Sequence, residues 1–539
     1  MIFKGFLGAF IALGAYLYFN WAIFSPELSK SAQIEQVFLE SWLDYKNNAW
    51  GADVYGPISR QNSNIYGSAD KPLGWIIVDT IDTLMLMQNS TQTFGKEFDE
   101  ELQDVENWVA NVLDYDIDVY VSVFETTIRM LGGLLSAHYL SNELKIGNST
   151  VYLEKAIDLA DRLMPAFETP TGIPYSSINL HTGEALKNHV DDGASSTAEF
   201  TTLQLEFKHV SFLTGDNKYW LAAEKVYKPL YEENDLISSF HGLVPIYTYP
   251  DSAKFRGTNI RLGSRGDSFY EYLLKQYLQT KEQLYYDLYR ESMEGVKKYL
   301  VSHSRPNNLV FFGEREHGLY NYLSPKMDHL VCFMGGLLGM GATEGHSIDE
   351  ARHMPFWDTK REEDWNLAQD LTFTCYQMYN QTPSGLAPEI VVFNANNAGN
   401  TQNFWQSARG DFFVKPLDKH NLQRPETVES IMFLYHLTGQ NDYRTQGWEI
   451  FEAFRKHSCV DCGTKNRRYT SLADGINVPT QKSDNLESFW LAETLKYIYL
   501  LFQDNVDLTS VVFNTEAHLL PVLTAKDLAA ANLKTGWEI

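Results

Sequence analysis

The chain has 539 residues, of which 44% are hydrophobic and 21% are charged, a balance typical of a globular protein and incompatible with a wholly disordered chain. Its formal net charge of −25 argues against a nucleic-acid partner, because phosphate binding requires a basic surface, and it disfavours attraction to anionic membranes. These values leave a protein with a neutral or cationic partner, or an enzyme that acts on uncharged substrates.

The N-terminal segment differs from the rest of the chain. Residues 5–24 contain no charged side chain and follow Lys4. Such a run can span a bilayer as a helix, and Lys4 favours a cytoplasmic N-terminus. We therefore expect a retained signal anchor over residues 1–24, a short stem over 25–34 and a lumenal domain over 35–539. A cleaved signal peptide is the alternative, although no small-x-small cleavage site follows the run.

Two further features are consistent with a lumenal body. Asn-x-Ser/Thr triplets, which are acceptors for glycosylation, occur at Asn89, Asn148 and Asn380. The even, low number of cysteines predicts two disulfides in a secretory chain; they are Cys332, Cys375, Cys459 and Cys462. The close spacing of the last two also occurs in zinc sites and redox motifs. The other two lack a matching spacing, and the small βαβ context of a redox motif is not seen.

Apolar residues recur at three- and four-residue spacing through most of the chain, which predicts helix after helix. The clearest segments are residues 123–140, 197–213, 268–279, 426–437 and 487–502. Polar turns follow several helices and an aromatic residue begins the next, as in a degenerate αα-hairpin repeat. No flexible linker interrupts the pattern. We therefore expect an all-α fold, either an open solenoid or a closed toroid, with strand-like insertions at 242–249 and 389–395.

Several carboxylates lie at the starts or on the apolar faces of these predicted helices. An acid in the first turn of a helix is usually a cap or a partner of the helix dipole. However, Asp267 and Glu271 share one helical stripe with Leu274 and Leu278, and burial of an unpaired carboxylate is costly. The other acids of this kind are Glu125, Glu426, Glu429 and Glu493.

Helices that start at one end of a barrel would bring these acids into one pocket, with Arg129, Arg265 and Arg424 as compensating charges. Acids interleaved with aromatic residues suit glycosidic cleavage, in which one acid protonates the leaving oxygen and another carboxylate activates water. Phe489 could pack against a sugar face, and ordinary core packing is the alternative for this ring.

Seven motifs in order carry a resemblance to a known family. They are VFETTIR (123–129), GDSFYEYLLK (266–275), MDHLVCF (327–333), GLAPE (385–389), LQRPETVES (422–430), ESFWLAETLKY (487–497) and VFNTEAH (512–518). Over nearly all of residues 35–520 the chain resembles the class I α-1,2-mannosidases, glycoside hydrolase family 47. The resemblance implies a single (αα)7 barrel and an inverting, Ca²⁺-dependent enzyme that removes terminal α-1,2-linked mannose from high-mannose N-glycans. We also expect a monomer.

The resemblance also assigns roles to individual residues. Glu125 takes the general-acid role, Glu426 is the base that activates water, and Asp267 is a third essential acid that competes with Glu125 as proton donor. Residues matching the lining of the sugar sites are Arg129, Arg265, Arg424, His329, Glu429, Phe489 and Glu493, with Glu199, Glu271 and Glu389 as further pocket acids. Thr515 matches the calcium ligand, through its hydroxyl and carbonyl oxygens. Cys332 and Cys375 match the recurrent disulfide, whereas a pair like Cys459 and Cys462 occurs in only part of the family.

Substrate preference and location are further expectations. Endoplasmic-reticulum-type members have arginine where this chain has Arg265, which implies removal of one mannose from Man9GlcNAc2 to give the Man8 B isomer. We expect a single-pass type II protein of the endoplasmic reticulum membrane, with the early Golgi as the alternative. A Golgi-type enzyme that trims to Man5, a weakly active quality-control relative that binds glycans and, without the resemblance, a structural α-solenoid scaffold are the competing hypotheses. The one departure noted from the motifs is Met-Gly-Gly at 334–336, and no catalytic motif position is missing.

Overall fold

The computed structural model describes residues 28–65, 71–396 and 398–537. The predicted signal anchor and the first residues of the stem lie outside these ranges. Within them, no helix is both long enough and apolar enough to cross a membrane.

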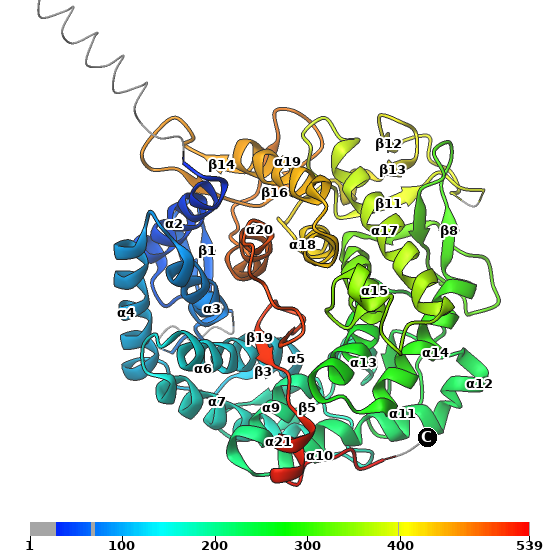
Figure 1. Cartoon of the computed structure of the whole chain (residues 1–539), viewed down its shortest axis with the longest axis horizontal. Helices are drawn as coiled ribbons and strands as arrows, with labels where there is room; N and C mark the ends of the chain where they lie inside the picture. Colours follow the sequence, from blue (N-terminus) through cyan, green and yellow to red (C-terminus); the bar gives the residue numbers. More distant parts are fainter. Residues whose placement is uncertain (1–27, 66–70, 397, 538–539) are drawn as a thin grey trace, which may run out of the picture.

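An inner ring of helices surrounds the centre of the molecule (Figure 1). Neighbouring members pack on one another, and α3 closes the ring by packing on the π-helical turn Trp490–Thr494 that leads into α20. The ring consists of α3 (Trp75–Ser90), α6 (Gly132–Leu144), α9 (Gln204–Thr214), α13 (Asp267–Thr280), α15 (Met334–Thr343), α18 (Glu426–Thr438) and α20 (Leu495–Leu501). The fold is therefore the closed toroid and not the open solenoid.

An outer layer of helices covers this ring (Figure 1). It consists of α2 (Lys30–Ala49), α4 (Gly95–Asn111), α7 (Ser149–Leu163), α10 (Lys218–Lys225), α14 (Gln283–Tyr299), α17 (Thr359–Asn380) and α19 (Asn441–His457). Each packs on an inner neighbour, so the described helices form the predicted (αα)7 barrel. Shorter helices are α5 (Val123–Glu125), α8 (Thr197–Phe200), α11 (Tyr227–Asn234), α12 (Leu236–Phe240), α16 (Ile348–Ala351) and α21 (Ala525–Ala530).

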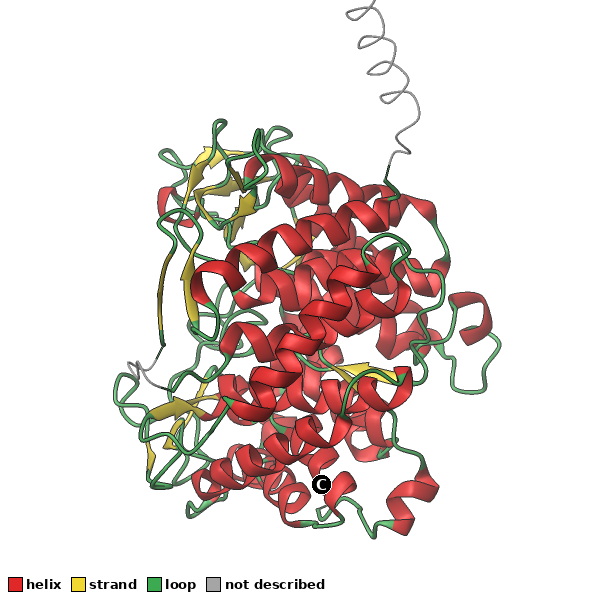
Figure 2. Cartoon of the chain, turned by 90° about the vertical axis from the view of Figure 1, so that its left-hand side faces the viewer, coloured by secondary structure: helices red, strands yellow, loops and turns green. Residues whose placement is uncertain are grey.

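Short antiparallel strands connect the helices, and most lie along one side of the helical body in Figure 2. The largest sheet has the order β10 (Lys326–Asp328), β11 (Ile390–Phe393), β13 (Phe412–Val414), β12 (Trp405–Gln406), and a second joins β3 (Tyr120–Ser122), β4 (Ser177–Asn179) and β5 (Ala185–Leu186). The two-stranded pairs are β1 (Val54–Gly56) with β2 (Gln61–Ser63), β6 (Ser195–Ser196) with β7 (Tyr247–Thr248), β8 (Val301–His303) with β9 (Val310–Phe312), β14 (Cys459–Val460) with β15 (Arg468–Tyr469), β16 (Leu472–Asp474) with β17 (Gln481–Lys482) and β18 (Val511–Phe513) with β19 (Leu519–Pro521). The two predicted strand-like insertions contain β7 and β11.

The β18–β19 hairpin enters the barrel and lies near its centre in Figure 1, where it packs on α6 and α13. Its turn, Asn514–His518, needs two glycines at the start of α6. A Cβ atom at Gly132 would lie 2.6 Å from Nδ2 of Asn514, and one at Gly133 would lie 2.6 Å from the carbonyl oxygen of Val78 on α3. The Gly-Gly pair therefore lets the hairpin and α3 approach α6 closely.

The outer helix α2 runs antiparallel to α20. Near the start of α2, Ser31 bonds Gln503 just beyond the end of α20 (3.4 Å), whereas Ser41 bonds Trp490 just before α20 begins (3.1 Å). The start of α2 therefore lies at the end of the barrel opposite to the end where α20 begins.

Three predicted helices are interrupted. The predicted segment 123–140 consists of α5, the π-helical turn Thr126–Leu131 and α6. Segment 487–502 begins with the second π-helical turn, and segment 197–213 breaks at residues 201–203 between α8 and α9. Single π-helical turns are frequent at functional sites, and both of these carry candidate site residues.

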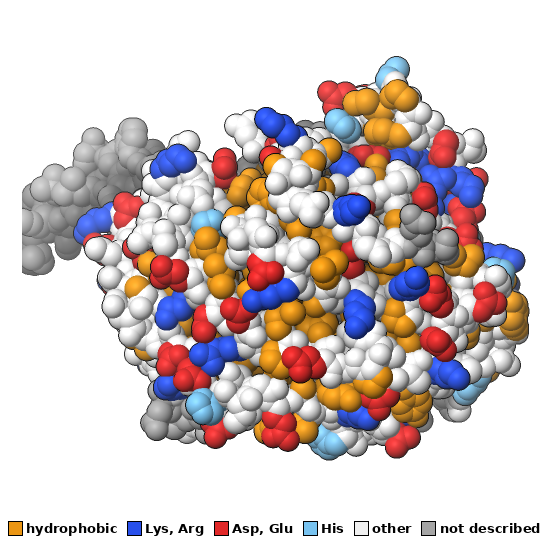
Figure 3. All heavy atoms as spheres, turned by 90° about the horizontal axis from the view of Figure 1, so that it is seen from below, with side chains coloured by type: hydrophobic (Ala, Val, Ile, Leu, Met, Phe, Trp, Pro, Cys, Tyr) orange, Lys and Arg blue, Asp and Glu red, His pale blue; other side chains and the backbone are white. Residues whose placement is uncertain are grey.

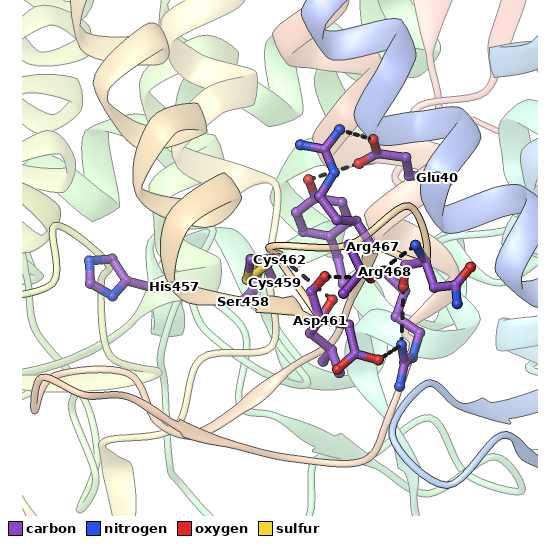
Figure 4. The surroundings of a disulfide bond; sticks show 12 residues. Glu40, His457, Ser458, Cys459, Asp461, Cys462, Arg467 and Arg468 are labelled. Atoms are coloured by element: carbon purple, nitrogen blue, oxygen red, sulfur yellow. Dashed lines mark hydrogen bonds and ion pairs between the residues drawn. A yellow bond between two sulfur atoms is a disulfide. The ribbon is translucent and has the colours of Figure 1, made fainter. Parts of the chain in front are cut away.

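Both predicted disulfides are present. Cys332–Cys375 has a Cα–Cα distance of 5.8 Å and joins the 3-10 turn His329–Phe333 to α17. Cys459–Cys462 closes the turn that follows β14, with a Cα–Cα distance of 5.7 Å (Figure 4). Asp461, inside this turn, bonds Arg468 at 2.6 Å, and Arg467 bonds Glu40 of α2 at 2.6 Å.

The surface carries charged side chains of both signs (Figure 3), as the 21% of charged residues in the sequence suggests. On the face drawn in Figure 3, acidic and basic side chains are interspersed among apolar ones. Asn89, Asn148 and Asn380 are all exposed, so each can be reached from solvent. Their occupancy by glycans remains a prediction.

Candidate active site

A cavity of about 350 Å³ opens at the end of the barrel where α13 and α18 begin. The hairpin turn contributes Thr515 and Glu516 to its lining. Most predicted site residues meet here: Glu125, Arg129, Glu199, Arg265, Asp267, Glu271, Arg424, Glu426, Glu429, Phe489, Glu493 and Thr515. The predicted acids therefore do meet in one pocket, while their chemical roles remain predictions.

Local structure explains how the acids reach the cavity. Asp267 is the first residue of α13, and a Cβ atom on the preceding Gly266 would meet the Arg261 carbonyl, so glycine is needed there. Glu426 is the first residue of α18 and follows Pro425, whose fixed φ suits a helix start. Glu125 ends α5 immediately before the first π-helical turn.

Glu426 is held in its ionised form. His329 Nδ1 lies 2.7 Å from Glu426 Oε2, and the other ring nitrogen of His329 lies 2.9 Å from the Tyr379 hydroxyl. Burial raises the pKa of Glu426, but the hydrogen bond and charge of His329 and the charge of Arg424 outweigh it, so the pKa is below its ordinary value. A buried carboxylate that stays ionised can accept a proton from water.

The pKa of Asp267 is shifted in the opposite direction. Burial, together with repulsion from Glu271 and Asp328, raises its pKa to about 7 despite the N–H of Ser268 that bonds its Oδ1 at 2.9 Å. Burial and repulsion from Glu125 likewise raise the pKa of Glu199 to about 7. A substantial fraction of Asp267 is therefore protonated near neutral pH and could donate that proton.

His329 and Glu389 do not line the cavity; they hold residues that do. His329 bonds Glu426, and Glu389 forms an ion pair with Arg424. The Arg424 guanidinium lies over the ring of Phe489, 5.5 Å from its centroid. Phe489 itself lines the cavity, where a sugar could pack against its ring.

Arg129 connects three acids at the base of the site. Its guanidinium bonds Glu125 at 2.9 Å and Glu516 at 2.7 Å, and approaches Asp79 at 3.5 Å. Glu516 was not singled out from the sequence, although it follows Thr515 in one of the seven motifs. Burial and the neighbouring Asp79 raise its pKa to about 7, against the influence of Arg129.

Arg265 is exposed at the rim of the cavity and has a left-handed backbone, with φ of 74°. Its guanidinium lies 5.5 Å from the centroid of the Tyr247 ring, and its carbonyl accepts the N–H of Ala198 at 3.0 Å. Among the described residues, no ion pair joins Arg265 to Asp267. The side chain is therefore available to a ligand entering the cavity.

Sequence reasoning missed a fully buried charged group beneath the lining, formed by Asp79, Asp82, Lys496 and His518. Asp82 bonds Lys496 at 2.8 Å and His518 at 3.0 Å, and His518 bonds Asp79 at 3.1 Å. One feature of the sequence could have indicated this buried group: Lys496 is a charged residue within the apolar run of α20.

Thr515 shares the cavity with several buried acids. Burial and neighbouring acids raise the pKa of Glu429 to about 8 and that of Glu493 well above its ordinary value. A divalent cation would offset this crowding of carboxyl groups, and calcium accepts oxygen ligands from hydroxyl, carbonyl and water. Within the described ranges, no group of three or more His, Cys, Asp or Glu side chains is arranged to hold a metal directly. A site at Thr515 would therefore depend on its own oxygens and on water.

The fold and the cavity define a class of enzyme. An ionised carboxylate, a protonated carboxyl group and an aromatic face in one cavity of an α/α barrel are the components of a glycoside hydrolase.

Comparisons with known proteins identify the family. The model of glycosyl hydrolase family 47 matches residues 37–522. The endoplasmic reticulum mannosyl-oligosaccharide 1,2-alpha-mannosidase of Saccharomyces cerevisiae is 62% identical over 511 residues, which cover 94% of this chain and 93% of that protein. The mannosyl-oligosaccharide 1,2-alpha-mannosidase of Candida albicans is 49% identical, over 100% of this chain and 92% of that protein.

The solved structure of the alpha-1,2-mannosidase from Trichoderma reesei superposes with a TM-score of 0.78 at 25% identity, covering 91% of this chain and 98% of that one. The chain belongs to glycosyl hydrolase family 47, and the family predicted from the motifs is confirmed.

Proposed function

We propose that the protein is an inverting, Ca²⁺-dependent α-1,2-mannosidase that removes mannose from high-mannose N-glycans of glycoproteins. The observation that carries the chemistry is the pairing, in one cavity, of an ionised Glu426 with an Asp267 whose pKa is about 7. The substrate class is supported by the names and high identity of the relatives from Saccharomyces cerevisiae and Candida albicans.

In the proposed reaction, Glu426 accepts a proton from the water that attacks the anomeric carbon, and an acid protonates the departing glycosidic oxygen. Asp267 is the favoured proton donor because its pKa of about 7 leaves it partly protonated near neutral pH. Glu125 remains the alternative donor, and it forms an ion pair with Arg129 at 2.9 Å. An inverting enzyme needs room for water, so the acid and base carboxyl groups are expected roughly 6.5–9.5 Å apart.

The proposed enzyme also requires a calcium ion in the cavity. Thr515 would hold it through its hydroxyl and carbonyl oxygens, and the acids nearby would bind its water ligands. When bound, the cation would supply positive charge that helps to orient sugar hydroxyls. Arg129 and Phe489 would position the sugar from the cavity wall.

Arg265 is proposed to limit the products to the Man8 B isomer. A guanidinium at the rim offers donors in a fixed fork, so it can hold one glycan branch and exclude others. Arg265→Leu should broaden the products toward Man5 without loss of the chemical step. Arg256 is the matched control, because it lies 5.4 Å from the same Tyr247 ring but does not line the cavity. A wild-type enzyme that ran readily to Man5 would favour the Golgi-type alternative.

We propose residence in the endoplasmic reticulum membrane as a single-pass type II protein, with the early Golgi as the alternative, and a monomeric catalytic body. Because α2 begins at the end of the barrel opposite to the cavity, an anchor before it would leave the cavity facing away from the membrane. That arrangement would give glycoprotein substrates free access.

The stereochemistry tests the proposed reaction. Mannose released at early times should be the β anomer by proton NMR, because water attacks the face opposite to the leaving group. Release of the α anomer would contradict the inverting assignment. Release of no mannose would favour the quality-control relative that binds glycans without efficient hydrolysis.

A further inference from the structure

Two buried lysines contact the hairpin turn on opposite sides of Thr515. Lys275 of α13 donates to the carbonyl oxygen of Asn514 at 3.1 Å, and Lys496 of α20 donates to that of Ala517 at 2.7 Å. The turn is thus held from two inner helices. Buried carbonyl groups need a donor, and the two lysines supply one on each side of Thr515.

Each lysine is neutralised by its own carboxylate. Lys275 bonds Glu271, and Lys496 bonds Asp82 of α3 at 2.8 Å. Lys496 and Asp82 are both 0% exposed. Such a buried pair contributes little net stability compared with apolar packing, so its presence beside the cavity suggests a role other than stability.

His518 joins this pair to the turn itself. Its two ring nitrogens lie 3.0 Å from Asp82 Oδ2 and 3.1 Å from Asp79 Oδ1. Burial lowers the pKa of His518, but the charges and hydrogen bonds of the two aspartates outweigh it and raise the pKa to about 9. The imidazolium therefore donates on both sides and ties the turn to α3.

Asn514 fixes the backbone within the turn. Its Oδ1 accepts the N–H groups of Glu516 at 2.8 Å and His518 at 2.9 Å, and its Nδ2 donates to the Ile128 carbonyl at 2.8 Å. The backbone N–H of Thr515 donates to the Tyr272 hydroxyl, which in turn donates to Glu206 at 2.7 Å. Thr515 is therefore flanked by fixed contacts on both sides.

We propose that Lys496, with its partners Asp82 and His518, is a positioning residue that fixes the turn Asn514–His518 so that Thr515 and Glu516 stay in the cavity lining. This inference rests on the proposed function, because it assigns Thr515 to the calcium site. Lys496 touches neither substrate nor water in the proposed reaction, and it acts through the Ala517 carbonyl and through His518.

The test compares Lys496→Met with Lys208→Met in the whole protein. Lys208 is also 0% exposed and also pairs with two acids, Glu224 at 3.0 Å and Glu282 at 2.9 Å. Those acids bond Gly536 and Thr535 near the C-terminus, and no hydrogen bond within the described chain joins Lys208 to the hairpin turn. Lys208→Met therefore reproduces the loss of a buried charge without disturbing the turn.

Calorimetry should show Ca²⁺ affinity lower by about 10- to 100-fold in Lys496→Met, the range found when groups supporting metal ligands are removed. Hydrogen exchange of residues 511–521 should also quicken. Lys208→Met should lower the melting temperature but leave both readouts near wild type. Lys496→Arg, which retains the charge, should recover part of the affinity.

A folded Lys496→Met protein with wild-type Ca²⁺ affinity and wild-type exchange in residues 511–521 would overturn the inference. If Lys496→Met does not fold, the same two measurements on His518→Gln test the inference. This variant weakens the contact between the turn and the two aspartates of α3 but keeps Lys275 and Lys496. If wild type itself bound no Ca²⁺, the calcium assignment would be wrong, and exchange of the turn would decide the positioning role by itself.

Discussion

At the residue scale, the proposed chemistry depends on two carboxyl groups whose pKa values are shifted in opposite directions. Burial would protonate both, and the surroundings separate them: Glu426 has His329 and Arg424 beside it, whereas Asp267 has Glu271 and Asp328. Environments that drive two pKa values apart assign the base and the acid.

Glu426→Gln should retain the fold and glycan binding while kcat falls by about 10²- to 10⁴-fold, because an amide cannot accept the proton of the attacking water. Steady-state kinetics on an oligomannose substrate provides kcat and KM. The exposed Glu100→Gln on α4 is the control for loss of an acid elsewhere. Near wild-type kcat in the Glu426 variant would remove it from the base role.

The pH dependence of kcat/KM should be bell-shaped. Asp267 must carry a proton to act as the acid, so activity should decline as pH rises through about 7. Glu426 must be ionised, and its lowered pKa places the acidic limb below its ordinary value of 4.5. Rates measured from pH 3 to 9 at constant Ca²⁺ check both limbs. A rate that stayed constant up to about pH 9 would contradict the assignment of Asp267.

The motifs predicted most of the cavity lining, because those residues lie next to one another in short segments. The same approach missed Asp79, Asp82 and His518, because their partners are far away in sequence: Asp82 and Lys496 are 414 residues apart. Periodicity reports only which face of one helix is apolar. The family resemblance predicted His329 and Glu389 among the residues of the sugar sites; in the structure they lie outside the cavity lining and contact Glu426 and Arg424.

At the element scale, helical periodicity located the segments but not their irregularities. The two π-helical turns retain the apolar spacing of an α-helix on average, so nothing in the pattern at 123–140 or 487–502 distinguished them. The turn at Asn514–His518 reads as an ordinary loop. Its importance arises from insertion into the barrel, which the Gly-Gly pair at 132–133 permits.

The two disulfides should differ in their contribution to stability. Cys332–Cys375 spans 43 residues and Cys459–Cys462 spans 3. In the chain-entropy model the longer loop gives roughly 4 kcal/mol and the shorter roughly 1.5 kcal/mol. Urea unfolding of the two double Cys→Ser variants should therefore show the larger loss for Cys332 and Cys375. An equal loss for both pairs would contradict this reasoning.

At the scale of the whole molecule, helical periodicity alone left the open solenoid and the closed toroid undecided, and the family resemblance predicted the closed barrel. Closure depends on α3 packing on the turn before α20, and Thr83 bonds the Ala492 carbonyl there at 3.3 Å across 409 residues. A repeat of αα-hairpins predicts only which helices are neighbours. The angle between one hairpin and the next, which decides whether the ring closes, is not encoded in the spacing of apolar residues.

Stability without calcium should fall as pH rises from about 5 to 8. The pKa values of Asp267, Glu199 and Glu206 are about 7, and that of Glu429 about 8, in the folded state. Raised folded-state pKa values mean that the folded protein binds more protons than the unfolded chain, so stability decreases between the unfolded and folded values.

Calcium should increase the melting temperature most at the upper end of this range, because it binds the folded state and offsets ionised acids. Thermal unfolding at several pH values with and without Ca²⁺ measures both effects. A melting temperature without calcium that did not change between pH 5 and 8 would contradict the burial of these acids.

The central claim is tested most directly by incubating the purified protein with Man9GlcNAc2, with Ca²⁺ and with a chelator, and separating the products by chromatography. Wild type with Ca²⁺ should release one mannose and accumulate the Man8 B isomer, while the chelated protein and Glu426→Gln should release almost none. Failure of folded wild type to release mannose with Ca²⁺ present, or equal release by the Glu426 variant, would contradict the proposed function.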